Sequence, residues 1–257
     1  MRYLRIALLF AVSILMSACG NSNSSVSSTP GTLSGNWQMS LLPTGKTLAR
    51  RQSGFLIQNG SAVTGGMMLL NNPCSGTGGV TGTVNGAGVS LNVNPTGVNV
   101  TLTGTLGSDQ QSMSGSYVLL ATGCTGTTAA PETGTWTANL VTPLNGNIQG
   151  TFTSKEGATY NVTGQLSQGP NTGITTASLT GNLSVSGYCF AAANIAGTVS
   201  GTALVLNLVD TTGAQVGQLT ATASLDGTLM TGRYSILPQT GTPPCEGGDG
   251  GTMTFSL

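Results

Sequence analysis

The chain has 257 residues, of which only 7 are basic and 7 acidic, and it contains 40 glycines and no histidine. Seven basic side chains scattered along the chain cannot neutralise a phosphate backbone. We therefore do not expect the protein to bind nucleic acid. Without histidine, the usual general base for a serine or cysteine nucleophile is missing, and we expect neither an enzyme nor a cofactor.

Residues 1–18 have the three parts of a secretory signal. Two arginines precede an apolar run over residues 6–16, and the small residues Ser17 and Ala18 come directly before Cys19. The apolar run is shorter than the roughly 20 residues that a membrane-spanning helix needs. We therefore expect residues 1–18 to be removed on export.

The segment Leu15-Met16-Ser17-Ala18-Cys19-Gly20 resembles the lipobox of bacterial lipoproteins, with Met16 where Leu, Val or Ile is usual. The resemblance implies that Cys19 becomes a lipid-bearing N-terminus that attaches the protein to a membrane of the cell envelope. Acyl chains contribute about 0.8 kcal/mol per buried methylene, so several chains anchor a protein permanently. Gly20 in place of Asp resembles the enterobacterial pattern for the outer rather than the inner membrane. The alternative is an ordinary signal peptide with a cysteine near its end.

Residues 19–31 are expected to be the lipidated N-terminus and a flexible tether. Asn21 to Gly31 is rich in Ser and Asn and shows no apolar periodicity. A coil of this length holds the body on the order of 20 Å from the lipid surface.

Residues 32–257 read as one pattern written twice. Leu33-Ser34-Gly35-Asn36 returns as Leu144-Asn145-Gly146-Asn147, at an offset of 111. Gly134-Thr135-Trp136-Thr137 returns as Gly251-Thr252-Met253-Thr254, at an offset of 117. Offsets that grow slowly along the chain are what loop insertions between aligned strands produce, so we predict an internal duplication.

Within each half the pattern is strand and turn throughout. Val98–Thr103 alternates apolar and small polar residues, the period-two signature of a strand with one buried face. Dipeptides such as Asn85-Gly86 mark tight turns, and we interpret the many glycines as punctuation between short strands. In the first half the predicted strands are 35–42, 53–59, 62–70, 79–85, 88–94, 97–106, 112–120 and 134–140.

These strands predict an all-β fold of two tandem antiparallel meander domains, 32–141 and 142–257, each of ordinary size for an independent core. Each half opens on L-x-G-N and closes on G-T-x-T followed by apolar residues. Pairing the first and last strands would close the sheet and remove exposed edges. We favour an eight-stranded up-and-down barrel in each half, with a β-sandwich as the alternative.

Gly35-Asn36-Trp37 resembles the G-x-W start of the lipocalin and avidin barrels, although the second half has Ile148 at the corresponding place. The resemblance implies a barrel and no ligand. The body as a whole is similar to Gly/Thr-rich β lipoproteins of unassigned function, a resemblance without any motif tied to chemistry.

Four further cysteines occupy matching places in the two halves. Cys74 and Cys124 are 50 residues apart, and Cys189 and Cys245 are 56 apart. Four cysteines allow three pairings, and the repeat selects Cys74–Cys124 with Cys189–Cys245. Disulfides agree with an exported protein, whereas a thiolate metal site is disfavoured because there is no CxxC pair and no histidine.

Glu246 and Asp249 could place two carboxylates on a calcium ion, which takes about six to eight oxygen ligands. The first half has no acidic counterpart, so a flexible loop held by the disulfide is the preferred interpretation and we expect no metal.

The remaining charged residues have structural interpretations. Lys46, Arg50 and Arg51 form the one basic cluster, which we expect in a solvated loop of the first hairpin. Asp109 and Asp226 occupy equivalent hairpin positions and are expected to form turns.

The sequence therefore predicts a lipid-anchored protein of the cell envelope with a non-enzymatic role, binding an envelope glycan or another protein or serving as a scaffold. One alternative is a carrier of small apolar ligands, which would need an open cavity inside a barrel. A second alternative, an envelope hydrolase, would need a nucleophile and base that the sequence does not reveal.

Overall fold

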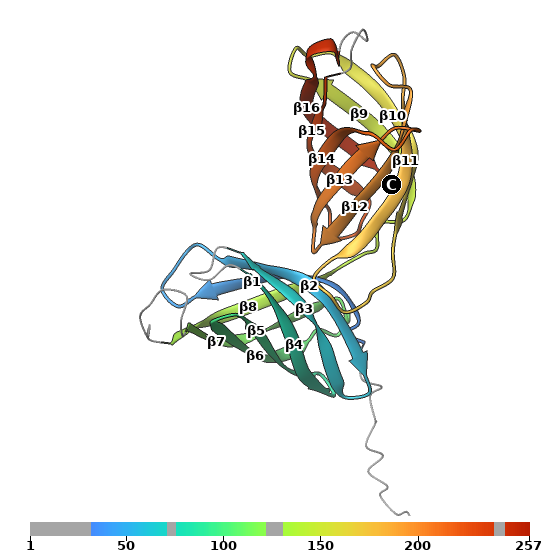
Figure 1. Cartoon of the computed structure of the whole chain (residues 1–257). Coiled ribbons are helices and arrows are strands. Elements are labelled where there is room, and N and C mark those ends of the chain that lie inside the picture. Colours follow the sequence, from blue (N-terminus) through green and yellow to red (C-terminus); the bar gives the residue numbers. More distant parts are fainter. Residues whose placement is uncertain (1–31, 71–75, 122–130, 239–244) are drawn as a thin grey trace, which may run out of the picture.

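A computed structural model describes residues 32–70, 76–121, 131–238 and 245–257. These residues form two closed, eight-stranded antiparallel barrels in which each strand pairs with the next along the chain (Figure 1). The predicted barrels are confirmed. The β-sandwich alternative is wrong, because the first strand of each half pairs with the last.

The strands lie close to their predicted positions, and in the first half each predicted boundary falls within three residues of the observed one. The first barrel consists of β1 (Gly35–Pro43), β2 (Arg50–Asn59), β3 (Ala62–Leu70), β4 (Gly76–Asn85), β5 (Gly88–Pro95), β6 (Val98–Leu106), β7 (Ser112–Ala121) and β8 (Glu132–Val141). The second barrel consists of β9 (Gly146–Ser154), β10 (Thr159–Gln168), β11 (Ala177–Val185), β12 (Ala192–Ser200), β13 (Ala203–Val209), β14 (Gln215–Ala223), β15 (Leu229–Ile236) and β16 (Asp249–Ser256). A short 3-10 helix, η1 (Cys245–Gly247), precedes β16. Among the described residues, no helix is long and apolar enough to cross a bilayer.

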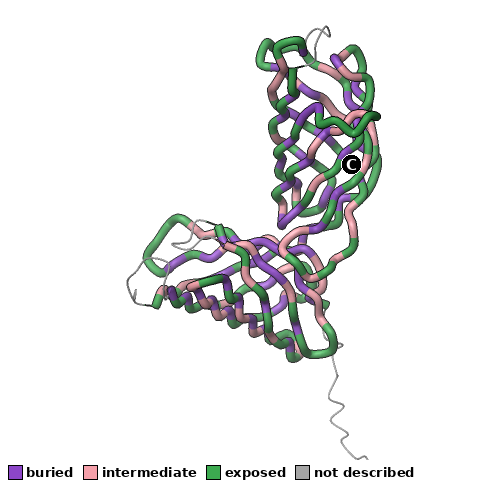
Figure 2. Tube along the Cα trace, in the orientation of Figure 1, coloured by how far each residue is buried: buried purple, intermediate pink, exposed green. Residues whose placement is uncertain are grey.

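Each barrel is built around its own apolar interior. In β5 the side chains of Val89, Leu91 and Val93 are buried, whereas the residues between them are partly exposed. The same alternation along the other strands gives the mixed colouring of the tubes in Figure 2. The bulkiest fully buried side chains include Trp37 and Trp136 in the first barrel. Burying a large apolar side chain contributes roughly 1.5–3 kcal/mol, so these filled interiors hold the two barrels together.

Many glycines lie inside strands rather than between them, which corrects their interpretation as turn punctuation. A Cβ on Gly115 in β7 would overlap the carbonyl oxygen of Thr103 and lie 2.5 Å from the Cα of Gly104 in β6. Gly232 in β15 occupies the same place in the second barrel, against Thr220. Closing a sheet of eight strands requires tight bends, and glycine allows neighbouring backbones to approach closely at these bends.

In each barrel a glutamine side chain binds the backbone just before the first strand, at the end of the barrel that we call its base. In the first barrel the side-chain oxygen of Gln58 accepts a hydrogen bond from the backbone N–H of Leu33 at 2.8 Å. In the second barrel Gln168 accepts one from Leu144 at 3.1 Å. Because Gln58 and Gln168 make equivalent bonds, β2 can be aligned with β10 residue by residue. In this alignment Arg50 of β2 corresponds to Tyr160 of β10.

The second barrel stands on the outer wall of the first through a buried polar contact (Figure 1). The side-chain amide of Asn36 in β1 donates to the carbonyl oxygen of Gly201 and accepts from its N–H, both at 2.8 Å. The hydroxyls of Ser53 and Ser200 lie 2.8 Å apart. Asn36, Ser53 and Ser200 are all at most 5% exposed. Because buried polar groups are costly unless paired, these bonds fix how the barrels meet.

Apolar contacts reinforce the same junction. Phe55 of β2 points away from its own barrel and joins the apolar cluster of the second barrel. The side-chain amide of Asn171 in the connection between β10 and β11 donates to the carbonyl oxygen of Leu56 at 2.6 Å. Strand β2 is therefore buried on both faces, which explains its apolar run over residues 55–57.

Candidate functional site

The two barrels carry related polar clusters at equivalent ends. We call the mouth of the first barrel the end with the connection 44–49 between β1 and β2. The mouth of the second barrel is the end with the connection 155–158 between β9 and β10. At each mouth a tyrosine from the seventh strand donates to an acidic residue at the start of the eighth: Tyr117 to Glu132 at 2.9 Å, and Tyr234 to Asp249 at 2.8 Å.

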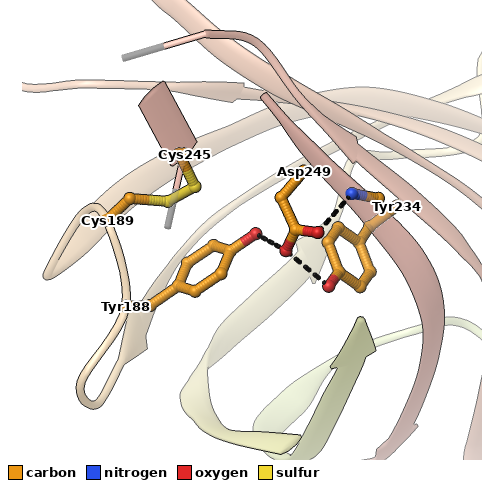
Figure 3. The surroundings of a disulfide bond; sticks show 6 residues. Tyr188, Cys189, Tyr234, Cys245 and Asp249 are labelled. Atoms are coloured by element: carbon orange, nitrogen blue, oxygen red, sulfur yellow. Dashed lines mark hydrogen bonds between the residues drawn. A yellow bond between two sulfur atoms is a disulfide. The ribbon is translucent and has the colours of Figure 1, made fainter. Parts of the chain in front are cut away.

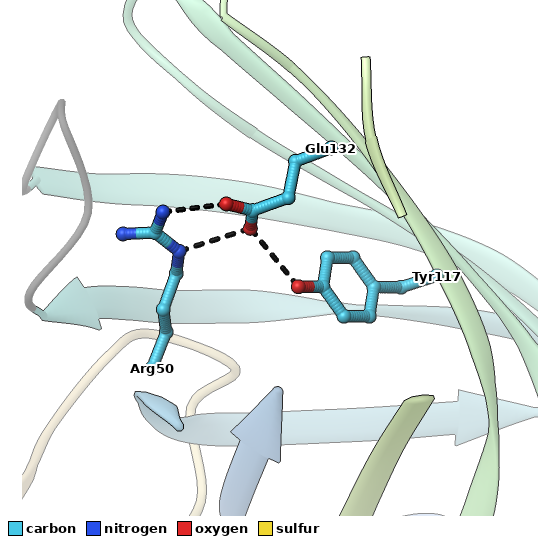
Figure 4. A network of polar contacts seen from close by, with 3 residues as sticks. All are labelled: Arg50, Tyr117 and Glu132. Carbon is cyan, nitrogen blue, oxygen red and sulfur yellow. Dashed lines mark hydrogen bonds and ion pairs between the residues drawn. The ribbon is translucent and has the colours of Figure 1, made fainter. Parts of the chain in front are cut away.

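At the first mouth the cluster is completed by an ion pair (Figure 4). Arg50 donates to both carboxylate oxygens of Glu132, with Nε at 2.9 Å and one terminal nitrogen at 2.5 Å. Burial alone would raise the pKa of the Glu132 carboxyl, but hydrogen bonds from Arg50 and Tyr117 outweigh it and lower that pKa. Burial and the bond to Glu132 raise the pKa of Tyr117. The carboxylate of Glu132 therefore accepts three hydrogen bonds from within the cluster, two from Arg50 and one from Tyr117.

The ion pair corrects the expectation that Lys46, Arg50 and Arg51 share a solvated loop. Arg50 and Arg51 begin strand β2, and alternation turns Arg50 into the mouth while Arg51 faces outward. Lys46 is exposed in the connecting loop, as predicted. Arg50 and Glu132 are 82 residues apart in sequence, so only the closed barrel brings them together.

One layer below Arg50, Gln52 is fully buried on the same face of β2. Neither polar atom of its side-chain amide has a hydrogen-bond partner among the described residues. An unpaired buried amide costs about 1–3 kcal/mol. By the register of the two barrels, Val162 occupies the equivalent place in the second barrel and carries no such cost.

At the second mouth two tyrosines converge on one carboxylate oxygen (Figure 3). Tyr188, from the connection between β11 and β12, donates to Oδ2 of Asp249 at 2.5 Å. Tyr234 donates to the same oxygen. Burial, followed by the bond to Asp249, raises the pKa of both tyrosines, so both remain protonated donors. The other carboxylate oxygen, Oδ1 of Asp249, accepts a hydrogen bond from the backbone N–H of Gly250 at 2.7 Å. This oxygen can accept a further hydrogen bond.

The predicted disulfide of the second half lies beside these tyrosines. Cys189 and Cys245 are bonded, with their Cα atoms 5.6 Å apart. The bond ties the loop that carries Tyr188 to η1, which leads into Asp249 (Figure 3). The disulfide therefore positions the two partners of the short hydrogen bond. The predicted pair Cys74–Cys124 and the lipidation site Cys19 lie outside the described residues.

Aromatic rings surround the second cluster. Tyr160, which occupies the place of Arg50, lies with its ring centroid 4.6 Å from that of Tyr188. Phe190 packs edge-on against Tyr188 at 5.4 Å, and Phe152 packs below Tyr234 at 4.4 Å. The first mouth therefore has an ion pair where the second mouth has the half-buried ring of Tyr160, packed against Tyr188.

An open cleft of about 1160 Å³ extends from this mouth across the outer face of β14 to β16. Its lining includes Tyr160, Tyr234, Asp249, Gln218, Lys155, Glu156 and Arg233. The second half of the chain contains seven charged residues, and four of them line this cleft. Because the second half has so few other charged residues, this concentration of charge beside two tyrosines makes the cleft the candidate binding site.

The acidic residues singled out in the sequence take different places. Glu246 is exposed in η1, whereas Asp249 is held by the tyrosines. In the described part of the chain, no group of three or more metal-ligating side chains forms. Asp109 and Asp226 accept backbone hydrogen bonds within their hairpins, from Gln111 at 2.9 Å and Thr228 at 3.1 Å, which confirms the turn prediction.

The sequence interpretation missed the tyrosines. Four tyrosines follow the signal segment, and all four contribute to the mouths: Tyr117, Tyr160, Tyr188 and Tyr234. Tyr117 and Tyr234 recur at the repeat offset of 117, and each precedes an acidic residue by 15 positions. That paired recurrence was the available signal for a duplicated site.

The fold and site define a protein of tandem up-and-down barrels with a polar and aromatic mouth. No protein-family model and no curated sequence matches the chain. Among solved structures, it is similar to the kievitone hydratase of Nectria haematococca, with 9% sequence identity over 89% of this chain and 90% of that chain, at a TM-score of 0.27. So low a TM-score supports no transfer of fold or activity between the two proteins.

Proposed function

We propose that this chain is a lipid-anchored, non-enzymatic protein of the bacterial cell envelope that binds a glycan in the cleft of the second barrel. The single observation that carries the binding role is the cleft itself, which is lined by four of the seven charged side chains of the second half together with Tyr160 and Tyr234. The anchor rests on the lipobox pattern that ends at Cys19. Gly20 after that cysteine favours the outer membrane as the site of attachment.

A glycan fits the chemistry of this cleft. Sugar rings offer an apolar face to an aromatic ring and hydroxyls to charged and amide groups. The half-buried ring of Tyr160 can pack against the apolar face of a sugar. Asp249 can accept hydrogen bonds from sugar hydroxyls, and Arg233 and Gln218 can donate to them. The cleft is open along one side, which suits part of a longer polymer better than a small enclosed molecule.

The two alternative functions have less support. An apolar ligand carrier would use a barrel interior, but both interiors are filled by buried side chains. A hydrolase would use a nucleophile with an adjacent base. Asp249 is held by tyrosines whose raised pKa keeps them protonated, which suits a fixed acceptor better than a proton-transfer group.

The anchor is tested by labelling cells with radioactive palmitate. We expect the wild-type protein to incorporate label and fractionate with membranes, because Cys19 carries the acyl chains. The Cys19→Ala variant should incorporate none. Equal labelling of the two proteins would exclude the lipid anchor while leaving the binding role of the cleft open.

The cleft is tested by NMR titration of the protein with a soluble N-acetylglucosamine tetrasaccharide and, separately, a glucose tetrasaccharide. We expect at least one of them to shift amides in 154–160 and 247–252, and Arg233→Ala or Tyr160→Ala to weaken that binding by about tenfold or more. Arg51→Ala, which removes an exposed arginine from the first barrel, is the matched control and should bind like wild type. If neither oligosaccharide shifts these amides, the glycan proposal is wrong.

A further inference from the structure

The exposed apolar side chains of the first barrel are concentrated at its mouth. In the described part of this barrel, five large apolar side chains are exposed: Leu42, Leu48, Leu70, Val118 and Leu120. Leu48 lies in the connection at the mouth and is 80% exposed, and the other four belong to the ends of β1, β3 and β7 that face the mouth. We call this group the leucine rim. Scattered exposed leucines are ordinary, but their collection at one end of a barrel is not.

Charge is uneven along the same barrel. All of its basic residues, Lys46, Arg50 and Arg51, lie at the rim, together with Glu132. Glu132 is paired with Arg50, so the described part of the rim has a net formal charge of +2 from Lys46 and Arg51. Asp109, the other acidic residue of the barrel, lies in the turn between β6 and β7 at the opposite end. The barrel is thus positive where it is apolar.

We propose that the leucine rim docks on the surface of a membrane that contains anionic lipids. Leucine side chains that project from a loop and strand ends can enter the boundary between headgroups and acyl chains. Lys46 and Arg51 can keep their charged ends among anionic headgroups while their stems lie along the apolar layer. The rim uses nothing from the second barrel, so the cleft remains free.

A lipid surface fits these side chains better than a protein partner does. The exposed apolar side chains are spread over one loop and three strands. Val118 and Leu120 are neighbours on β7, and the exposed residues Thr133 and Thr135 of β8 separate them from Leu42 of β1. A protein interface requires a continuous, shape-matched apolar centre, whereas a bilayer accepts separate side chains.

The length of chain before the barrel permits docking on the membrane that holds the anchor. Thirteen residues, 19–31, precede the first described residue, which lies at the base of the barrel opposite the rim. Fully extended, they reach at most about 45 Å, whereas the nine residues of β1 span about 30 Å. The rim can therefore contact the membrane without breaking the attachment at Cys19. The docking itself does not depend on the acyl chains.

The experiment measures sedimentation of residues 19–257 carrying Cys19→Ala, so that neither the signal segment nor an acyl chain contributes, with phosphatidylcholine vesicles with and without phosphatidylglycerol. We expect binding to the anionic vesicles that weakens between low salt and about 0.5 M salt. Leu48→Ser with Leu120→Ser should weaken binding by about tenfold or more. Lys46→Gln with Arg51→Gln should weaken it and flatten the salt dependence.

The control changes two exposed leucines of the second barrel, Leu225→Ser with Leu229→Ser, and should bind vesicles like the parent. Thermal unfolding of each variant verifies that it is folded. The proposal is overturned if the parent binds neither kind of vesicle, or if both leucine pairs weaken binding equally. It is also overturned if the rim changes abolish self-association while vesicle binding stays the same, since the rim would then be an interface between copies of this chain.

Discussion

We expect the replacement of both Cys189 and Cys245 by alanine to lower the free energy of unfolding of the second barrel by about 4 kcal/mol. The two residues are 56 positions apart, and the crosslink restricts the unfolded chain over that loop. The change leaves Cys74 and Cys124 untouched. It also frees the loop that carries Tyr188, which then loses its fixed approach to Asp249.

The two barrels can be followed separately in this experiment. Both tryptophans, Trp37 and Trp136, lie in the first barrel, so their fluorescence during urea unfolding reports on that barrel. Hydrogen exchange of peptides from β11, β12 and β16 reports on the second. We expect hydrogen exchange to show the full loss of stability in the second barrel. Tryptophan fluorescence should show a smaller loss in the first barrel, because the two barrels are coupled through the junction at Asn36 and Gly201. A loss below about 1 kcal/mol in the second barrel would contradict the prediction.

The same substitution connects the disulfide to the proposed glycan site. If the disulfide positions Tyr188, the double variant should also bind the oligosaccharide more weakly, even at temperatures where it is folded. Weaker binding without unfolding would separate positioning from stability.

Most of the fold could be predicted because its determinants are local. Alternation such as that of Val98–Thr103 specifies a strand and its buried face, and the repeat specifies that the result occurs twice. Closure into barrels followed from the matched first and last strands, which the structure pairs through Leu41 and Trp136. The pairing Cys189–Cys245 followed from the same repeat.

The junction and the mouths could not be predicted in the same way, because their residues are distant in sequence. Asn36 and Gly201 are 165 positions apart and look like ordinary outward-facing residues until the barrels meet. Strand β2 did carry a signal in its unbroken run over residues 55–57, since a strand exposed on one face would alternate. Arg50 was assigned to a loop because charge in a Gly-rich sequence is normally solvated. The recurrence of Tyr117 as Tyr234, each 15 positions before an acidic residue, indicated Glu132 and Asp249 but not Arg50.

Glycines inside strands were the other feature that the sequence concealed. Composition shows 40 glycines but does not distinguish a turn from a place where two backbones approach. Gly86 has a positive φ of 56° in a turn, as its Asn-Gly dipeptide predicts. Gly115 lies in the middle of β7 and has no such local mark. Its role becomes visible only when the curvature of the closed sheet is known.

We therefore expect Gly115→Ala to lower the free energy of unfolding of the first barrel by about 3 kcal/mol, the upper part of the usual range for overpacking. The added methyl would overlap backbone atoms of Thr103 and Gly104, which cannot move aside as a flexible side chain could. Gly115 pairs with Trp136 on its other side, so tryptophan fluorescence during urea unfolding measures the effect directly.

Two other glycines make this test specific to close approach rather than to glycine as a residue type. Gly79 in β4 has open space where a Cβ would stand, so Gly79→Ala should be neutral or stabilise by about 0.4–1 kcal/mol through the unfolded chain. Gly104→Ala should fall between the two variants. Its equivalent in the second barrel is Ala221, which packs against Gly232 there. Equal losses for Gly79→Ala and Gly115→Ala would show that strand glycines here are not required by the bend of the barrel wall.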